Sequence, residues 1–237
     1  IVNEHDLVLI EDVCDALGST FDGQMMGTFG EVATLSFYPA HHITLGEGGA
    51  VCTRDARLAR IARSVRDWGR ESDNDDQRYV FTEIGYNLKL TDPQAALGLA
   101  QLEKLPDFVA ARKRNFQRLY SGLRKWDQQL LLPCWHSKAD PSWFAFPITV
   151  RAGAAFNRQQ LIRHLESAMV ETRVLFGGNV VRQPGFSGID CRIVGDLPVS
   201  DSVLHSSFFI GVYPGLDEAR IDYMLEVFAD FMRAELR

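Results

Sequence analysis

The stretch Ser36–Val51, "SFYPAHHITLGEGGAV", has the pattern of the end of a buried strand, a turn, and a glycine-rich return into a second strand. It predicts strands at Ala33–Tyr38 and Gly49–Thr53, because short apolar runs bounded by turn residues are typical of strands in a covered sheet. The adjacent His41 and His42 lie between the two strands. The stretch therefore predicts two strands of a covered sheet with a titratable pair in the turn between them.

The amino-acid composition indicates which classes of protein this chain fits. The chain has 237 residues, of which 46% are hydrophobic and 24% charged, the balance of a soluble globular protein with one large or two small domains. A net charge of −6 with both signs interspersed argues against nucleic acid or an anionic membrane as partner, and no apolar run approaches the ~20 residues of a membrane-spanning helix. The four cysteines form no Cys-x-x-Cys pair, so no disulfide framework and a cytoplasmic location are expected.

Residues 1–105 have the pattern of a first, larger α/β part. The apolar run Leu7–Ile10 predicts a strand covered on both faces. Apolar residues at helical spacing predict a helix over Asp55–Val65, with Asp55 as its N-cap.

A proline interrupts the next helical pattern. The segment "TDPQAALGLAQLEKL" predicts a helix capped by Thr91 or Asp92, and Pro106 is expected to end it. A long amphipathic helix then continues to Trp126. Residues 106–237 are thus predicted to hold this linking helix and a small C-terminal α/β domain.

Beyond about residue 140 the pattern is that of the small domain. An alternation of apolar residues predicts a strand through Phe144, Phe146, Ile148 and Val150. Asn157–Met169 is predicted to be a helix capped by Asn157, with Gln160 three residues on. A strand over Val170–Phe176 and a closing helix over Asp217–Met232 are also predicted.

Three side chains carry chemistry beyond what packing requires. Asp12, at the carboxyl end of a predicted strand, could hold a cation or a protonated ring nitrogen, or serve only as a helix cap or salt bridge. The Ser36 hydroxyl could bond a phosphate or only the backbone. His41 is a candidate general base, since imidazole titrates near neutral pH, whereas His42 is more simply a surface or packing residue.

Three segments together resemble a known family. "VLIEDVCDALGS", "LSFYPAHHITLGEGGAV" and "IGYNLKLTDPQAALGLAQLEKL" are similar to the sugar aminotransferases among the fold-type I vitamin B6 enzymes. The resemblance implies the C-terminal part of that fold: residues 1–105 would be the remainder of the large cofactor-binding domain, with a mainly parallel sheet. In most members a Ser-Phe-x-x-x-Lys motif supplies the lysine that binds pyridoxal phosphate covalently, and here that position is His41.

Histidine in place of lysine implies the subgroup of nucleotide-sugar 3-dehydratases. "SFYPAHHIT", "SWFAFPIT", "TRVLFGGN" and "FIGVYPGL" resemble the enzymes acting on CDP-4-dehydro-6-deoxyglucose in particular. Such an enzyme holds pyridoxamine 5′-phosphate (PMP) without a covalent bond. It removes the C3 hydroxyl of a nucleotide-activated 4-keto-6-deoxyhexose in 3,6-dideoxyhexose biosynthesis, as for a lipopolysaccharide O-antigen. His41 would be the base that takes a proton from the C4′ carbon of the cofactor.

The resemblance assigns roles to matching positions near the cofactor. Asp12 would partner the pyridine nitrogen, and Ser36 would bind the phosphate. Asn87 would reach the cofactor phosphate of a partner subunit, which implies a homodimer.

Three further positions are those at which the dehydratases differ from ordinary aminotransferases. Asp15 falls where aminotransferases often carry glutamine, near the ring hydroxyl of the cofactor. Tyr38 and Phe176 would lie near the cofactor or the sugar and contact the substrate.

Two features depart from the family. A substantial N-terminal part, which would supply a phosphate-binding helix N-terminus and a side chain stacked on the ring, is not in this chain. Relatives of the CDP type also carry a [2Fe-2S] cluster. Cys14 matches the first of its four cysteine ligands, but the segment Glu71–Gln77, where the others would lie, has none. Cys14 is therefore a metal ligand only if those three cysteines exist in the full protein.

Several functions remain open from the sequence. With a cluster, a separate flavin or iron–sulfur reductase would deliver electrons. A cluster-free enzyme, resembling GDP-4-keto-6-deoxymannose 3-dehydratase, would regenerate its cofactor with glutamate. A non-catalytic sugar-binding relative is the alternative from another class, and Asp12 and Ser36 argue against it because they would serve only a bound cofactor. An ordinary aminotransferase is disfavoured, because His41 cannot replace the lysine.

Overall fold

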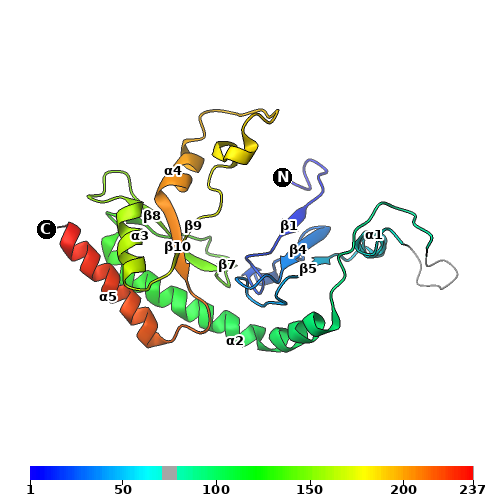
Figure 1. The fold of residues 1–237 in the computed structure, drawn as a ribbon, viewed down its shortest axis with the longest axis horizontal. Coiled ribbons are helices and arrows are strands. Elements are labelled where there is room, and N and C mark those ends of the chain that lie inside the picture. Colours follow the sequence, from blue (N-terminus) through cyan, green and yellow to red (C-terminus); the bar gives the residue numbers. More distant parts are fainter. Residues whose placement is uncertain (71–78, 237) are drawn as a thin grey trace. The chain divides into compact units, whose positions relative to one another are not determined.

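The protein is described by a computed structural model that covers residues 1–70 and 79–236. It divides into two units (Figure 1): Ile1–Ala110 with Ser137–Ser142, and Ala111–His136 with Trp143–Arg237. The assignment of residues 1–105 and 106–237 to two domains stays a prediction. In the part of the chain that the structure describes, no helix combines the length and apolar character needed to cross a membrane.

A three-stranded sheet in the first unit carries the candidate site. Its strands lie in the order β1 (Ile10–Asp12), β4 (Val32–Ser36), β5 (Gly49–Cys52). β1 and β4 are parallel, with Asp12 opposite Thr34, whereas β4 and β5 are antiparallel, with Ser36 opposite Gly49. The two strands predicted around His41 and the α/β class are confirmed.

A second small sheet in the same unit joins segments far apart in the sequence. It consists of β3 (Gln24–Met25), β2 (Thr20–Phe21) and β7 (Ala139–Asp140), in that order and antiparallel. No local pattern predicts β7, because its partner β2 lies near the start of the chain.

The strand predicted over Leu7–Ile10 is wrong in position and in burial. β1 covers Ile10–Asp12, and the side chains of Leu7, Val8 and Ile10 are exposed. An apolar run indicates only that its side chains favour burial. Here the register is set by pairing with β4 and by Glu11, whose buried side chain points inward between its exposed neighbours.

Glu11 ties β1 to the loop that precedes β4. Its carboxylate accepts backbone N–H groups from Gly27 at 2.7 Å, Phe29 at 2.8 Å and Gly30 at 2.7 Å. Burial raises the pKa of Glu11, but the three backbone hydrogen bonds together outweigh it, and the pKa lies below its ordinary value of 4.5. The charged form is therefore the one that the fold stabilises.

We expect Glu11→Gln to lower the free energy of unfolding by about 2–3 kcal/mol at pH 7, because an amide cannot accept all three N–H groups and its NH₂ would face donors. Since the folded-state pKa is lowered, the stabilisation is present above the ordinary pKa of 4.5 and is lost as pH falls through the folded value. Urea unfolding at several pH values should show the wild type and the variant converging in acid.

Glu31→Gln is the matched control for Glu11→Gln. Within residues 1–70 and 79–236, the exposed Glu31 carboxylate accepts one backbone N–H, from Leu9 at 2.8 Å, so its loss should cost less than about 1 kcal/mol. Equal losses in the two variants would contradict the role given to Glu11.

The two α-helices that the structure describes in the first unit begin at the expected residues. α1 (Ala56–Arg66) is preceded by Asp55, whose carboxylate accepts the N–H of Arg57 at 2.7 Å and of Leu58 at 3.3 Å. At the start of α2 (Asp92–Leu123), the backbone N–H of Thr91 donates to Oε1 of Gln94 at 3.0 Å and its hydroxyl donates to the same atom at 2.9 Å. Thr91 rather than Asp92 thus stands at the N-cap position, where its carbonyl accepts the N–H of Ala95 and Gln94 accepts its backbone N–H, but the Thr91 hydroxyl donates to Gln94 instead of accepting an N–H of the helix.

α2 is one continuous helix, so the prediction that Pro106 ends it is wrong. A proline inside a helix removes one backbone hydrogen bond and costs about 3 kcal/mol. Burial of side chains farther along the same helix offsets this cost: Phe116, Leu119 and Leu123 are all fully buried.

The second unit is a four-stranded antiparallel sheet packed against helices. The strand order is β6 (Leu130–Leu131), β8 (Ala145–Val150), β10 (Ser207–Gly211), β9 (Thr172–Val174). The helices are α3 (Arg158–Ser167), α4 (Pro198–Ser206), α5 (Glu218–Glu235) and the short η2 (Arg124–Trp126), η3 (Val180–Arg182) and η4 (Pro184–Phe186). Neither β10 nor α4 is predicted, although the apolar run at Phe208–Ile210 is a usable signal.

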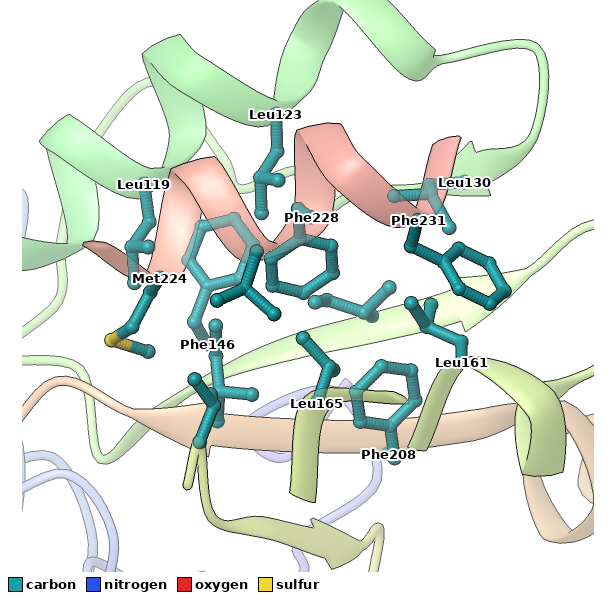
Figure 2. Packing of buried hydrophobic residues seen from close by; sticks show 14 of the residues in the cluster. Leu119, Leu123, Leu130, Phe146, Leu161, Leu165, Phe208, Met224, Phe228 and Phe231 are labelled. Atoms are coloured by element: carbon teal, nitrogen blue, oxygen red, sulfur yellow. The ribbon is translucent and has the colours of Figure 1, made fainter. Parts of the chain in front are cut away.

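Figure 2 shows the core of this unit. Leu119 and Leu123 of α2 and Phe228 of α5 meet Phe146 of β8 and Phe208 of β10. The alternation predicted for β8 is confirmed, since Phe146, Ile148 and Val150 are buried. The capping box of α3 is also confirmed, with Asn157 and Gln160 each bonding the backbone of the other.

Candidate active site

His41 lies in the turn after β4, against the end of β1. Its Nδ1 lies 2.8 Å from the carbonyl oxygen of Cys14 and 3.0 Å from Oδ1 of Asp15. A carbonyl oxygen only accepts hydrogen bonds, so Nδ1 carries the hydrogen and the lone pair of the neutral ring is on Nε2. The fold therefore selects the nitrogen that can act as a base.

Asp15 acts on His41 through its charge. Its Oδ1 is buried and makes no hydrogen bond among the described residues, although Nδ1 of His41 is 3.0 Å away. Burial raises the pKa of Asp15, a positive charge on His41 opposes this, and the carboxylate of Asp12 adds to it. The Asp15 carboxylate therefore lies where its charge attracts a positive charge on the His41 ring.

Asp12 ends β1 with an exposed carboxylate. Its Oδ1 accepts the backbone N–H of Cys14 at 3.1 Å and the hydroxyl of Thr34 at 3.4 Å. Hydrogen bonds from the thiol and the backbone of Cys14 are the main reason that the pKa of Asp12 lies below its ordinary value of 3.8. Asp12 is therefore a permanent anion at neutral pH, as a partner of a protonated ring nitrogen must be.

Ser36 and Tyr38 lie at the end of β4 and just beyond it. The Ser36 oxygen accepts the backbone N–H of Tyr38 at 3.3 Å, which leaves its hydroxyl hydrogen to donate to an anion. The ring centroids of Tyr38 and His41 are 6.4 Å apart, with the planes at 78°. The sheet end thus brings Asp12, Asp15, Tyr38 and His41 into one group, with Ser36 on the adjoining strand.

His42 points the other way, into the first unit. Its Nε2 lies 2.8 Å from the hydroxyl of Ser142, which lies 2.9 Å from the hydroxyl of Ser19, and all three side chains are buried. His42 is therefore a packing residue, one of the two roles expected of it. It anchors the turn from which His41 projects.

Asn87 belongs to a different group of side chains in the first unit. Lys89 donates to Oδ1 of Asn87 at 2.9 Å and to Asp67 at 2.7 Å, and its Nζ lies 3.3 Å from the ring centroid of Trp68. Arg70 donates to both carboxylate oxygens of Asp67 at 2.7 Å. Within the described residues, Asn87 has no contact with the His41 group. Its proposed role toward another subunit's cofactor is compatible with this placement.

Phe176 lies in the second unit, after β9. Its φ is 48°, a strained value for a residue with a β-carbon, and its ring is largely exposed. The rings of Phe144 and Phe209 lie 6.3 Å and 6.0 Å from it. Its role in substrate binding stays a prediction.

Comparison with known proteins assigns the chain to a family. Residues 1–229 match the model of the DegT/DnrJ/EryC1/StrS aminotransferase family. The chain belongs to this family.

Relatives within the family include dehydratases. The chain is 46% identical to the lipopolysaccharide biosynthesis protein RfbH of Salmonella typhimurium, over 98% of this chain and 58% of that protein. It is 48% identical to the dTDP-4-dehydro-2,6-dideoxy-D-glucose 3-dehydratase of Saccharopolyspora spinosa, over 98% of this chain and 55% of that enzyme. The chain thus spans little more than half the length of these relatives.

Solved structures of the family share the fold. The E. coli GDP-4-keto-6-deoxy-D-mannose 3-dehydratase with bound hydrated PLP superposes with a TM-score of 0.86 at 27% identity, over 95% of this chain and 61% of that chain. The fold-type I assignment, with its mixed helices and sheets, is therefore confirmed.

The side chains fit the pyridoxal-type cofactor that the family implies. The exposed anion of Asp12 suits the protonated ring nitrogen, and the Ser36 hydroxyl suits a phosphate oxygen. His41 lacks the amine needed for a covalent bond, so the cofactor would be held by non-covalent contacts alone.

The described residues do not form a metal site. Among residues 1–70 and 79–236, no group of three or more His, Cys, Asp or Glu could hold a metal ion. Cys14 contacts Thr34, with Sγ 3.9 Å from Oγ1, and the segment Glu71–Gln77 lies outside the described residues. Cys14 as a cluster ligand, and the [2Fe-2S] cluster itself, stay predictions.

Two groups of residues were missed by the sequence reasoning. Lys89 stands two positions from Asn87 in an extended segment, and this spacing puts both side chains on one face, so a signal existed. Ser142 supports the His41 turn from the far side of the sequence, and no local pattern could reveal that contact.

Proposed function

We propose that the protein is a PMP-dependent nucleotide-sugar 3-dehydratase that removes the C3 hydroxyl of a 4-keto-6-deoxyhexose. The observation that carries this proposal is His41. The resemblance implies that it stands at the position of the family's lysine, and its Nδ1 is protonated toward Cys14 and Asp15, which leaves the lone pair on Nε2. That side chain is a base and cannot bind the cofactor covalently.

Each residue of the site has a separate task in this proposal. A bound PMP would supply an amine able to react with the C4 ketone of the sugar and a ring able to relay electrons toward C3. Asp12 keeps the ring nitrogen protonated, because its carboxylate stays charged. Ser36 and Asn87 hold the phosphate, and Asp15 lies near the ring hydroxyl.

His41 moves the proton that starts the reaction. Nε2 takes it from the C4′ carbon of the cofactor, and the nearby Asp15 carboxylate stabilises the imidazolium that results. The proton that Nε2 has taken up would then pass to the C3 hydroxyl, which departs as water and leaves His41 neutral again. Tyr38, edge-on to His41, and Phe176 would border the sugar.

The substrate proposed is CDP-4-dehydro-6-deoxyglucose or a closely similar nucleotide sugar. Support comes from the relatives above, whose names include a dTDP-sugar 3-dehydratase and a lipopolysaccharide biosynthesis protein. The pathway would then supply a 3,6-dideoxyhexose, and a cytoplasmic location follows from the nucleotide-sugar substrate.

A second candidate differs in how the enzyme is reset after dehydration. GDP-4-keto-6-deoxy-D-mannose 3-dehydratases match the chain in both sequence and structure, at 27% identity for the E. coli O55:H7 protein. An enzyme resembling them would regenerate PMP with glutamate, whereas one with a [2Fe-2S] cluster bound through Cys14 would need a reductase. Visible absorbance that bleaches on reduction distinguishes the cluster-bearing form.

The test of the proposal is turnover by the full-length protein. With PMP and CDP-4-dehydro-6-deoxyglucose, we expect loss of water from the sugar, seen by mass spectrometry, and exchange of the C4′ hydrogen with solvent. Both should stop when PMP is omitted. Sugar binding that is independent of cofactor, with no turnover, would instead support a non-catalytic protein.

We also propose a homodimer in which Asn87 serves the partner's cofactor. A run of exposed apolar side chains near Asn87 supports a subunit interface, since such patches mark contact sites: Tyr79, Phe81, Ile84, Tyr86, Leu88, Leu90, Leu97, Leu99 and Leu102.

Subunit mixing tests this arrangement. His41→Asn and Asn87→Ala homodimers should each have low activity. After exchange of subunits in a 1:1 mixture, about a quarter of all sites should regain both residues, because half of the dimers are mixed and each has one intact site. No recovery, despite heterodimers seen by native mass spectrometry, would show that Asn87 acts within its own subunit.

A further inference from the structure

Lys89 and its surroundings form a built group beside Asn87. Its ammonium contacts three things at once: the Asp67 carboxylate at 2.7 Å, Oδ1 of Asn87 at 2.9 Å, and the face of Trp68 at 3.3 Å. Three such contacts hold an otherwise flexible lysine in one position.

The backbone around this group is held just as closely. Segment 81–88 pairs with segment 65–70: Trp68 N–H bonds Tyr86 O at 2.9 Å, and Tyr86 N–H bonds Val65 O at 2.7 Å. The approach is so close that a Cβ on Gly69, whose φ is 84°, would collide with the carbonyl of Glu83. Asn87 and Lys89 therefore project from a rigid support.

The contact with Lys89 decides which way the Asn87 amide faces. An ammonium group only donates, so the atom it bonds must be the amide oxygen. The amide NH₂ is thereby turned away from Lys89, and among the described residues Nδ2 has no hydrogen-bond partner. A side-chain NH₂ presented in this way is a donor for an anionic oxygen.

The charge of the group points to the same kind of ligand. Arg70 and Lys89 both pair with Asp67, whose pKa is lowered first by the hydrogen bond from Arg70 and then by that from Lys89. Lys89 thus places a positive charge beside the Asn87 amide, which favours an anionic ligand such as a phosphate.

We propose that Lys89 is a positioning residue that orients the Asn87 amide so that its NH₂ donates to the cofactor phosphate. This inference rests on the proposed function, in which Asn87 is the phosphate ligand. Lys89 acts through Asn87 and does not itself touch the phosphate.

A double-mutant cycle on PMP affinity tests the proposal in the full-length protein. We expect Lys89→Met to weaken PMP binding about tenfold, as for loss of one charge-assisted hydrogen bond, and Asn87→Ala to weaken it at least as much. The double variant should bind no more weakly than Asn87→Ala alone, because without Asn87 there is nothing for Lys89 to orient. Dissociation constants are measured by fluorescence titration.

Three controls separate positioning from other effects. Pyridoxamine, which lacks the phosphate, should bind all variants equally. Lys89→Arg keeps a hydrogen-bond donor and the positive charge, so its PMP affinity should lie within about threefold of that of the wild type. If Lys89→Met unfolds, the PMP affinity of Lys89→Arg becomes the test of the positioning role. Lys125→Met removes a similar lysine–tryptophan contact in the second unit, where Nζ lies 4.3 Å from the Trp126 ring, and should leave PMP affinity unchanged.

The outcomes distinguish this inference from the proposed function. Additive losses of PMP affinity in the double variant would mean that Lys89 contacts the phosphate directly, and this result would overturn the positioning role. Unchanged PMP binding by Lys89→Met would overturn it as well. If Asn87→Ala binds PMP normally, it is the assignment of Asn87 as phosphate ligand that fails.

Discussion

Replacing His41 by Asn in the full-length protein should reduce the rate of dehydration by ~10²–10⁴-fold, the usual loss when a general base is removed. Asparagine is close in size and polar, so the fold and PMP affinity should be retained. Exchange of the C4′ hydrogen with solvent should fall in parallel, because Nε2 is the atom that removes it. Both rates are measured with PMP and the 4-keto nucleotide sugar, the exchange by NMR.

A histidine with a similar local contact provides the matched control. Nδ1 of His205 lies 2.7 Å from the carbonyl oxygen of Asp201, much as Nδ1 of His41 meets Cys14, but His205 is on α4 of the second unit. His205→Asn should keep the native rate. If His41→Asn also keeps it, the base is another residue, with Tyr38 the first to examine.

His41→Lys should change the chemistry rather than abolish it. The resemblance implies that the family's lysine occupies this position, so the variant should bind pyridoxal phosphate covalently, turn yellow, and retain the cofactor on dialysis after borohydride reduction. Weak transamination at C4 of the sugar is then expected. A colourless variant that releases its cofactor would contradict the placement of His41 at the lysine position.

The second large effect is expected from Asp12. Asp12→Asn keeps the shape of the side chain but removes the negative charge that holds a proton on the ring nitrogen. We expect the dehydration rate to fall by ~10²–10³-fold, as on removal of one preorganised electrostatic partner. The absorbance spectrum of bound PMP should shift as well, since it reports the protonation of the ring.

An exposed aspartate far from the sheet end is the control for Asp12→Asn. Asp22 pairs with Lys138, at 2.7 Å, on the surface of the first unit. Asp22→Asn should leave both the rate and the spectrum unchanged. An unaltered PMP spectrum in Asp12→Asn would show that Asp12 does not contact the ring nitrogen.

Local sequence determined a good part of this protein. Asp55 and Asn157 cap helices because their side chains reach the next free N–H groups, which requires only neighbours in the chain. The alternation through β8 and the strands on either side of His41 are equally local. The resemblance carried by "SFYPAHHITLGEGGAV" was enough to name the family and to single out His41.

Tertiary structure decided what depends on distant partners. The run Leu7–Ile10 is exposed because an apolar pattern does not provide its own cover, and α2 continues through Pro106 because burial at Phe116 and Leu119 outweighs one lost hydrogen bond.

The chemistry of the site also depends partly on the local sequence and partly on the tertiary structure. The sequence by itself identified His41 as the candidate base, but only the fold selects Nε2, since the Cys14 carbonyl that occupies Nδ1 lies in the turn after β1, 27 residues earlier in the chain. Likewise, only the fold seats Lys89 on Trp68 and Asp67 and so turns the amide of Asn87. The sequence specifies the residue types. The proton position on His41 and the orientation of the Asn87 amide depend instead on neighbours that folding brings within 3 Å of these side chains.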